Sequence, residues 1–167
     1  MNLTEQLDHE LERLAGFTSA TPRTAALSAP DDIDLAIDFT AVDSMSCAFR
    51  ELRLRVPTLA AAGFDALKAW AEALSKRITY LLENIGPLEL DPAAGQVLIR
   101  STAPDQRPGS TSFYEILLTA QGGGQFALRR YRSQKGLPGR DQVDVQVTHE
   151  VLRKLVTDLV ETIPATA

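Results

Sequence analysis

Five basic residues between positions 129 and 140 are the side chains whose types and spacing best suit a chemical role. They are Arg129, Arg130, Arg132, Lys135 and Arg140. Residues 96–140 hold seven basic residues against two acidic ones, although the whole chain has a net charge of −5. Tyr114, Phe126 and Tyr131 are interleaved with the set, and basic and aromatic residues together can bind RNA or another anionic ligand.

A second interpretation of the same pattern is structural. A basic segment can complement acidic elements of its own chain or the acidic face of a second subunit. We favour this interpretation, because a dedicated nucleic-acid-binding protein usually carries a basic excess, whereas this chain is acidic. Nucleic acid is therefore disfavoured as a partner.

Residues typical of catalysis are sparse in this chain. The only histidines are His9 and His149, and the only cysteine is Cys47. No nucleophile elbow, phosphate loop or cysteine-based metal site is present, and the acidic run from 31 to 43 lacks the spacing of a calcium loop. We predict no catalytic, cofactor or metal residue. The sequence leans against an enzyme, and an enzyme of unfamiliar type would have to use the central hairpin around Glu115.

An apolar stripe between residues 58 and 83 predicts the longest helix of the chain. Four residues of its first half are candidates for the wall of an apolar pocket between this helix and a sheet: Phe64, Leu67, Trp70 and Leu74. Such a pocket would suit a small or lipid-like ligand. The same four residues would equally serve as ordinary core, because an amphipathic helix must bury its apolar face.

The first 30 residues predict a helix followed by a connection. Leu3, Leu7, Leu11 and Leu14 form one apolar stripe, which favours an amphipathic helix over residues 1–16. Residues 17–30 are rich in Ser, Thr, Ala and Pro, and we predict a linker-like loop there. The first helix would then be free to detach from the core of residues 31–167 or to exchange between subunits.

The remainder of the chain alternates between apolar and polar residues, as antiparallel strands do. In the strand predicted over 46–56, the alternation changes phase near Arg50 and Glu51, which predicts a bulge. Thr148 is placed to cap a final amphipathic helix that ends before Pro164. The pattern predicts one α+β domain with a twisted antiparallel sheet of about six to seven strands, and the long helix and terminal helices packed on one face.

Composition and order together suggest how such a protein would act. With one cysteine, a polar N-terminus and no long apolar run, we expect a cytoplasmic protein that does not enter a membrane. In size, acidity and helix-and-sheet order the chain loosely resembles the type III secretion chaperones, which are dimeric and bind peptides. We therefore expect a non-enzymatic interaction, chaperone or adaptor-like module that self-associates as a homodimer. The alternatives are the small apolar ligand and the anionic ligand described above.

Overall fold

The computed structural model describes residues 1–60, 62–81, 85–101, 105–120 and 124–165. The described residues form three α-helices, one 3₁₀ turn and ten strands. In chain order these are α1 (Leu3–Arg13), β1 (Thr18–Ala29), β2 (Ile33–Val42), β3 (Ser46–Arg55), the 3₁₀ turn (Pro57–Leu59), α2 (Gly63–Arg77), β4 (Ile85–Asp91), β5 (Gln96–Ser101), β6 (Asp105–Arg107), β7 (Ser110–Thr119), β8 (Gln125–Gln134), β9 (Asp141–Val143), β10 (Val145–Thr148) and α3 (His149–Glu161).

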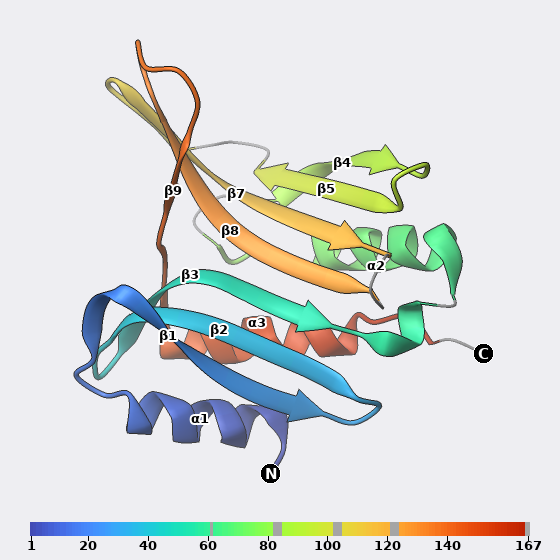
Figure 1. The fold of residues 1–167 in the computed structure, drawn as a ribbon, viewed down its shortest axis with the longest axis horizontal. Helices are drawn as coiled ribbons and strands as arrows, with labels where there is room; N and C mark the ends of the chain where they lie inside the picture. The colour runs from blue at the N-terminus through green and yellow to red at the C-terminus, as the bar shows by residue number, and fades with distance from the viewer. Residues whose placement is uncertain (61, 82–84, 102–104, 121–123, 166–167) are drawn as a thin grey trace.

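All strands pair antiparallel in one sheet. Its seven main strands follow the order β1-β2-β3-β8-β7-β5-β4, and the short strands β6, β9 and β10 pair with β7, β8 and β3. The sheet is strongly twisted; in the view of Figure 1, α2 and α3 lie behind it and α1 lies beside its edge strand β1. The predicted α+β class, with a long helix and two terminal helices against one face of an antiparallel sheet, is therefore confirmed.

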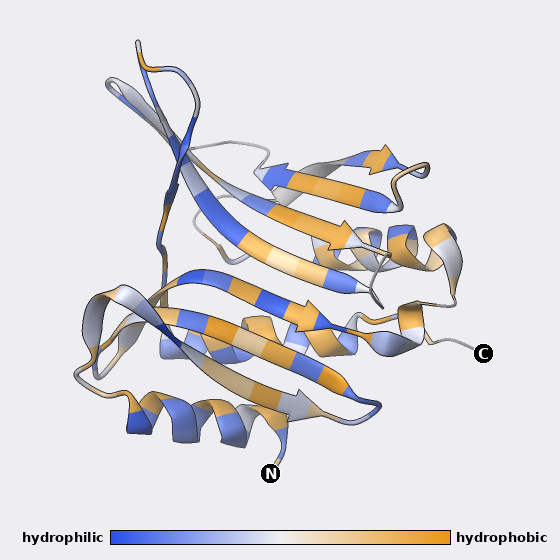
Figure 2. Ribbon diagram, in the orientation of Figure 1, coloured by the Kyte–Doolittle hydropathy of each residue, from blue (hydrophilic) through white to orange (hydrophobic). Residues whose placement is uncertain are grey.

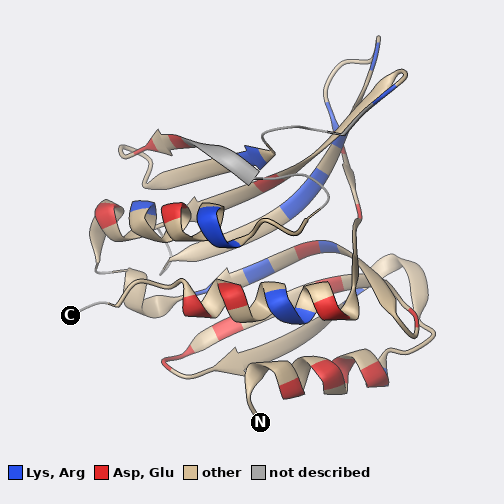
Figure 3. Cartoon of the chain, turned by 180° about the vertical axis from the view of Figure 1, so that it is seen from behind, with Lys and Arg blue, Asp and Glu red and all other residues tan. Residues whose placement is uncertain are grey.

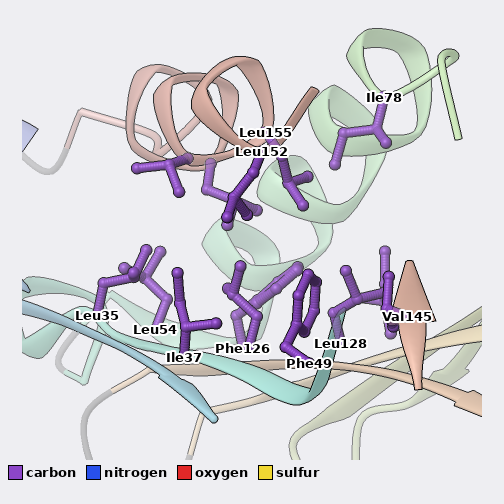
Figure 4. Packing of buried hydrophobic residues seen from close by; sticks show 14 of the residues in the cluster. Leu35, Ile37, Phe49, Leu54, Ile78, Phe126, Leu128, Val145, Leu152 and Leu155 are labelled. Carbon is purple, nitrogen blue, oxygen red and sulfur yellow. The ribbon is translucent and has the colours of Figure 1, made fainter. Parts of the chain in front are cut away.

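The core fills the space between this sheet and the helices. Figure 4 shows Phe49, Phe126 and Leu128 rising from the sheet toward Leu152 and Leu155 on α3. All five side chains are buried. Because the helices cover only one side, alternate residues of each strand enter this core and the others point away from it.

The segment after α1 corrects our prediction. Residues 17–30, which we predicted to be a linker-like loop, contain the edge strand β1, paired with β2 along most of its length. Only Ala25 and Leu27 of this strand are buried. Its composition is weakly apolar because an edge strand with one wet face has few residues to bury, and pairing with β2 supplies the order that the composition does not indicate.

Helix α1 packs on the core of its own chain. Leu7, Leu11 and Leu14 are buried there. The side-chain amide of Gln6 donates to the carbonyl of Ser28 at 2.7 Å and accepts from its N–H at 2.9 Å, which ties α1 to β1. Nothing in this arrangement requires the helix to detach.

The predicted details at residues 46–56 and 148 are confirmed, whereas the long helix is shorter than predicted. Between the paired positions Ile37–Leu52 and Phe39–Phe49, β3 holds two residues against one on β2, which places the bulge at Arg50 and Glu51. Thr148 caps α3 by accepting a hydrogen bond from the N–H of Val151.

The stretch predicted as one helix over 58–83 is a 3₁₀ turn followed by α2, which ends at Arg77, and residues 82–84 lie outside the described part. Within the described residues, the helices are too short or too polar to cross a membrane.

The two edges of the sheet share an irregular feature. In β1 the pairing with β2 slips between Thr18 and Arg23, a stretch that contains Pro22. In β4 the pairing with β5 slips between Ile85 and Leu88, a stretch that contains Pro87. Proline has no amide hydrogen, so each outer strand lacks a donor at that position.

Candidate binding face on the open side of the sheet

We call the side of the sheet that none of the three described helices covers the open face, and it has small residues at its centre. Strand pairing aligns one row of outward-facing residues across five strands: Ala26 on β1, Ala36 on β2, Arg53 on β3, Ala127 on β8 and Leu117 on β7. Figure 2 shows the alternation of polar and apolar residues along β2 and β3 that produces it. Three of the five members are alanines, so the sheet surface there is not filled by side chains.

This row forms the floor of a hollow. The cavity has a volume of about 510 Å³ and spans β1, β2, β3, β8 and β7. That volume lies within the range of about 300–1,000 Å³ that is typical of ligand pockets. Polar and charged residues surround the alanines, among them Ser28, Asp34, Glu51, Arg53, Arg55, Thr119, Gln125 and Arg129.

Alternating charges cross the open face beside the hollow. Arg53 donates to Asp38 at 2.5 Å and to Glu51 at 3.0 Å, and Thr24 donates to Asp38 at 2.6 Å. Arg129 donates to the second oxygen of Glu51. The Glu51 side chain is only 13% exposed, so one partly buried carboxylate joins arginines from two neighbouring strands, β3 and β8.

The same pattern continues toward the other edge. Arg140 stacks on the ring of Tyr131, with its guanidinium carbon 3.8 Å from the ring centre, and donates to Glu115. Arg100 reaches the same carboxylate at 3.5 Å. Phe113 stacks beside Tyr131, with the ring centres 6.0 Å apart. We call the seven charged residues Asp38, Arg53, Glu51, Arg129, Arg140, Glu115 and Arg100 the charge ladder.

The pairing shifts the ionisation of the groups at the start of the ladder. Partial burial of Asp38 disfavours its charged form, but the hydrogen bonds from Arg53 and Thr24 outweigh that effect and hold the pKa of Asp38 below its usual value. The hydrogen bond to Asp38 is the largest cause that raises the pKa of Arg53. Both groups are therefore charged at neutral pH, and the ladder is formed before any partner arrives.

The five predicted anion-binding residues do not form one patch. Arg129 faces the open side and pairs with Glu51, whereas Arg130, the next residue along β8, is buried toward the helices with its guanidinium over the ring of Tyr114. Lys135 is exposed beyond the end of β8. Neighbouring residues on a strand point to opposite faces, so a cluster in sequence is divided between two surfaces.

Arg132 and Arg140 have different surroundings. Arg132 follows Tyr131 on β8, lies opposite Asp141 of β9 in the strand register, and is exposed. Arg140 belongs to the charge ladder. Of the predicted set, the open face thus brings together Arg129 and Arg140, and it adds four partners that the sequence analysis did not single out as site residues: Asp38, Glu51, Arg53 and Arg100.

The four predicted pocket residues lie on the helix side. Leu67, Trp70 and Leu74 are buried in the core, and Phe64 packs against it. The Trp70 ring is 6.0 Å from that of Phe126, and its N–H donates to Thr162 at 3.1 Å. The hollow of about 510 Å³ is on the opposite face of the sheet and includes none of these four residues.

Other candidate reactive groups lie away from the open face. Cys47 is buried, and burial is the main cause that raises the pKa of its thiol to about 12, so it is an unreactive thiol at neutral pH. His149 contacts the carbonyl of Ser46 at 3.1 Å. Among the described residues, no three His, Cys, Asp or Glu side chains gather where they could hold a metal ion.

The helix side has a different charge from the open face. Helix α1 carries Glu5, Asp8, Glu10 and Glu12 against a single basic residue, Arg13. In Figure 3, acidic positions coloured red recur along α1. The acidic excess of the chain is therefore carried in part by the helical layer.

No protein-family model, curated protein or solved structure matches the chain significantly.

Proposed function

We propose that this protein is a non-enzymatic interaction module that self-associates, and that two copies meet through their open faces. The observation that carries this proposal is the hollow over Ala26, Ala36 and Ala127, framed by charges that are already paired within the chain. A hollow with preformed walls can receive side chains from a partner without first breaking its own ion pairs. Preorganisation of this kind lowers the cost of binding.

The balance of charge favours a second copy as the occupant. The groups around the hollow comprise three carboxylates and three guanidinium groups: Asp34, Asp38, Glu51, Arg53, Arg55 and Arg129. The whole chain has a charge of −5, and α1 is acidic. Two copies that approached through α1 would bring like charges together, whereas the balanced charges around the hollow can meet without that repulsion.

The terminal helices do not support the proposal. The sequence analysis leaves the first helix free to exchange between subunits, but the apolar sides of α1 and α3 are buried in their own core. The support therefore comes from the open face alone. A twofold dimer would use the same surface on both copies, as most soluble homodimers do.

The proposed dimer is tested by a substitution that fills the hollow with a large side chain. Ala127→Trp places a large side chain on its floor, and Ala69→Trp makes the same change on an exposed position of α2. Mass is measured by native mass spectrometry and by sedimentation over a range of concentrations. We expect a dimer for the unmodified protein and for Ala69→Trp, and a monomer for Ala127→Trp. An unmodified protein that stays monomeric at every concentration would contradict self-association.

A further inference from the structure

A second cavity lies near the far end of the charge ladder. It has a volume of about 420 Å³ and is lined by Arg100, Ser101, Thr111, Phe113 and Arg140. These residues come from β5, from β7 and from the end of the segment that returns to β9. It shares no lining residue with the hollow over the alanines, so it is a separate site on the open side of the molecule.

Among the described residues that line the cavity, two are arginines and none is acidic. Arg100 and Arg140 both contact the single carboxylate of Glu115, at Oε2. Arg100 also approaches Glu89 at 3.7 Å, but that side chain is 64% exposed and its charge is screened by water. Each guanidinium has five N–H donors, and Glu115 can occupy only some of the ten. A second anion in the cavity would accept hydrogen bonds from the N–H donors of Arg100 and Arg140 that Glu115 does not occupy.

One wall of the cavity is flat and aromatic. The Phe113 ring lines it, and the guanidinium of Arg140 is held against the rings of Tyr131 and Phe113, at 3.8 Å and 5.9 Å from their centres. Stacking fixes the plane of the guanidinium, so fewer conformations are lost when it binds an acid group. A flat wall next to fixed donors suits a flat ligand that carries an acid group.

We propose that this cavity binds a small aromatic carboxylate, whose acid group pairs with Arg100 and Arg140 and whose ring stacks on Phe113. Ser101 and Thr111 add hydroxyl groups at the rim. Glu115 keeps both arginines in place and is not displaced. The two guanidinium groups form charge-assisted hydrogen bonds to the acid group, which are stronger than neutral ones.

The test titrates the full-length protein with benzoate and follows its amide signals by NMR. Cyclohexanecarboxylate has the acid group without the aromatic ring, and inorganic phosphate has charge without any ring. We expect benzoate to saturate the site and to bind more tightly than either comparator. Failure of benzoate to saturate, or equal binding of phosphate, would overturn the proposal.

Variants then locate the binding site. Arg140→Lys keeps the charge but loses the stacked, planar donor, and we expect about tenfold weaker benzoate binding. Phe113→Leu should weaken benzoate and leave cyclohexanecarboxylate unchanged. Arg132→Lys is the matched control and should bind benzoate as the unmodified protein does. If Arg132→Lys weakens binding as much as Arg140→Lys, the site is not this cavity.

The proposed dimer and this site can be tested separately. The variant Ala127→Trp alters only the hollow over the alanines, so its folded monomer should retain benzoate binding. Loss of benzoate binding in that monomer would overturn the assignment to an independent cavity.

Discussion

The two faces of the sheet are built from the same strands and use alternate residues for different purposes. On the covered face, large apolar side chains such as Phe49, Phe126 and Leu128 are buried against the helices. On the open face, the same strands carry alanines and the charge ladder. Burying one large apolar side chain contributes about 1.5–3 kcal/mol, whereas a solvent-exposed ion pair contributes about 0–1 kcal/mol.

This difference separates stability from recognition. The covered face carries most of the buried apolar surface and therefore most of the free energy of folding, and the open face is the surface for which we propose a binding role. Substitutions on the covered face should therefore unfold the protein, and substitutions on the open face should change binding while the fold persists.

The largest effect is expected from Trp70→Ala. Trp70 is fully buried, contacts Phe126 and donates to Thr162, so its loss leaves a large cavity and an unpaired hydroxyl acceptor. We expect the free energy of unfolding to fall by about 3–5 kcal/mol, measured by urea denaturation. The control is Leu117→Ala on the open face, where we expect a loss of about 1 kcal/mol or less. Equal losses would remove the distinction between the faces.

A smaller effect is expected from Glu51→Gln. This change neutralises the carboxylate that Arg53 and Arg129 share, and we expect a loss of about 1 kcal/mol in the free energy of unfolding. Asp34→Asn is the control, since within the described part of the chain Asp34 pairs with Arg55 alone, and both side chains are half exposed. Its effect should stay within about 0.5 kcal/mol. If Asp34→Asn lowers the free energy of unfolding as much as Glu51→Gln does, the shared carboxylate of Glu51 contributes no more than an ordinary exposed ion pair.

The smallest effect is expected in the pH dependence of stability, through Asp38. The pKa of Asp38 is lowered in the folded chain, so its ion pair adds stability above the ordinary aspartate pKa of about 3.9. That contribution is lost as the pH falls through the lower pKa of the folded state. We expect the unmodified protein to lose more stability than Asp38→Asn in urea denaturation series run from about pH 5 to below pH 3. Parallel pH curves for the two proteins would contradict the shift.

Local patterns in the sequence were enough to predict the fold class. The leucine stripe of α1, the cap at Thr148 and the phase change at Arg50 and Glu51 each depend on residues close together in the chain. Strand β1 could not be predicted in this way. Its composition resembles that of a loop because few of its residues are buried. Its strand conformation comes from pairing with β2 and from the contact between Gln6 and Ser28.

The candidate site was largely hidden from sequence reasoning because it depends on strand register. Arg129 and Arg130 look like one basic cluster, yet a strand sends them to opposite faces. Glu51 and Arg129 are 78 positions apart and meet only because β3 and β8 are neighbours. The basic excess of residues 96–140 did contain the relevant arginines, but their partners could not be assigned.

The prolines at the two edges limit how copies of this chain can aggregate. Unpaired edge strands are templates for further strands, and continued addition leads to fibrils. Pro22 and Pro87, each within a stretch where the pairing slips, interrupt both templates. We expect the two prolines to hinder the addition of further strands at either edge of the sheet, and so to limit the growth of filaments from copies of this chain.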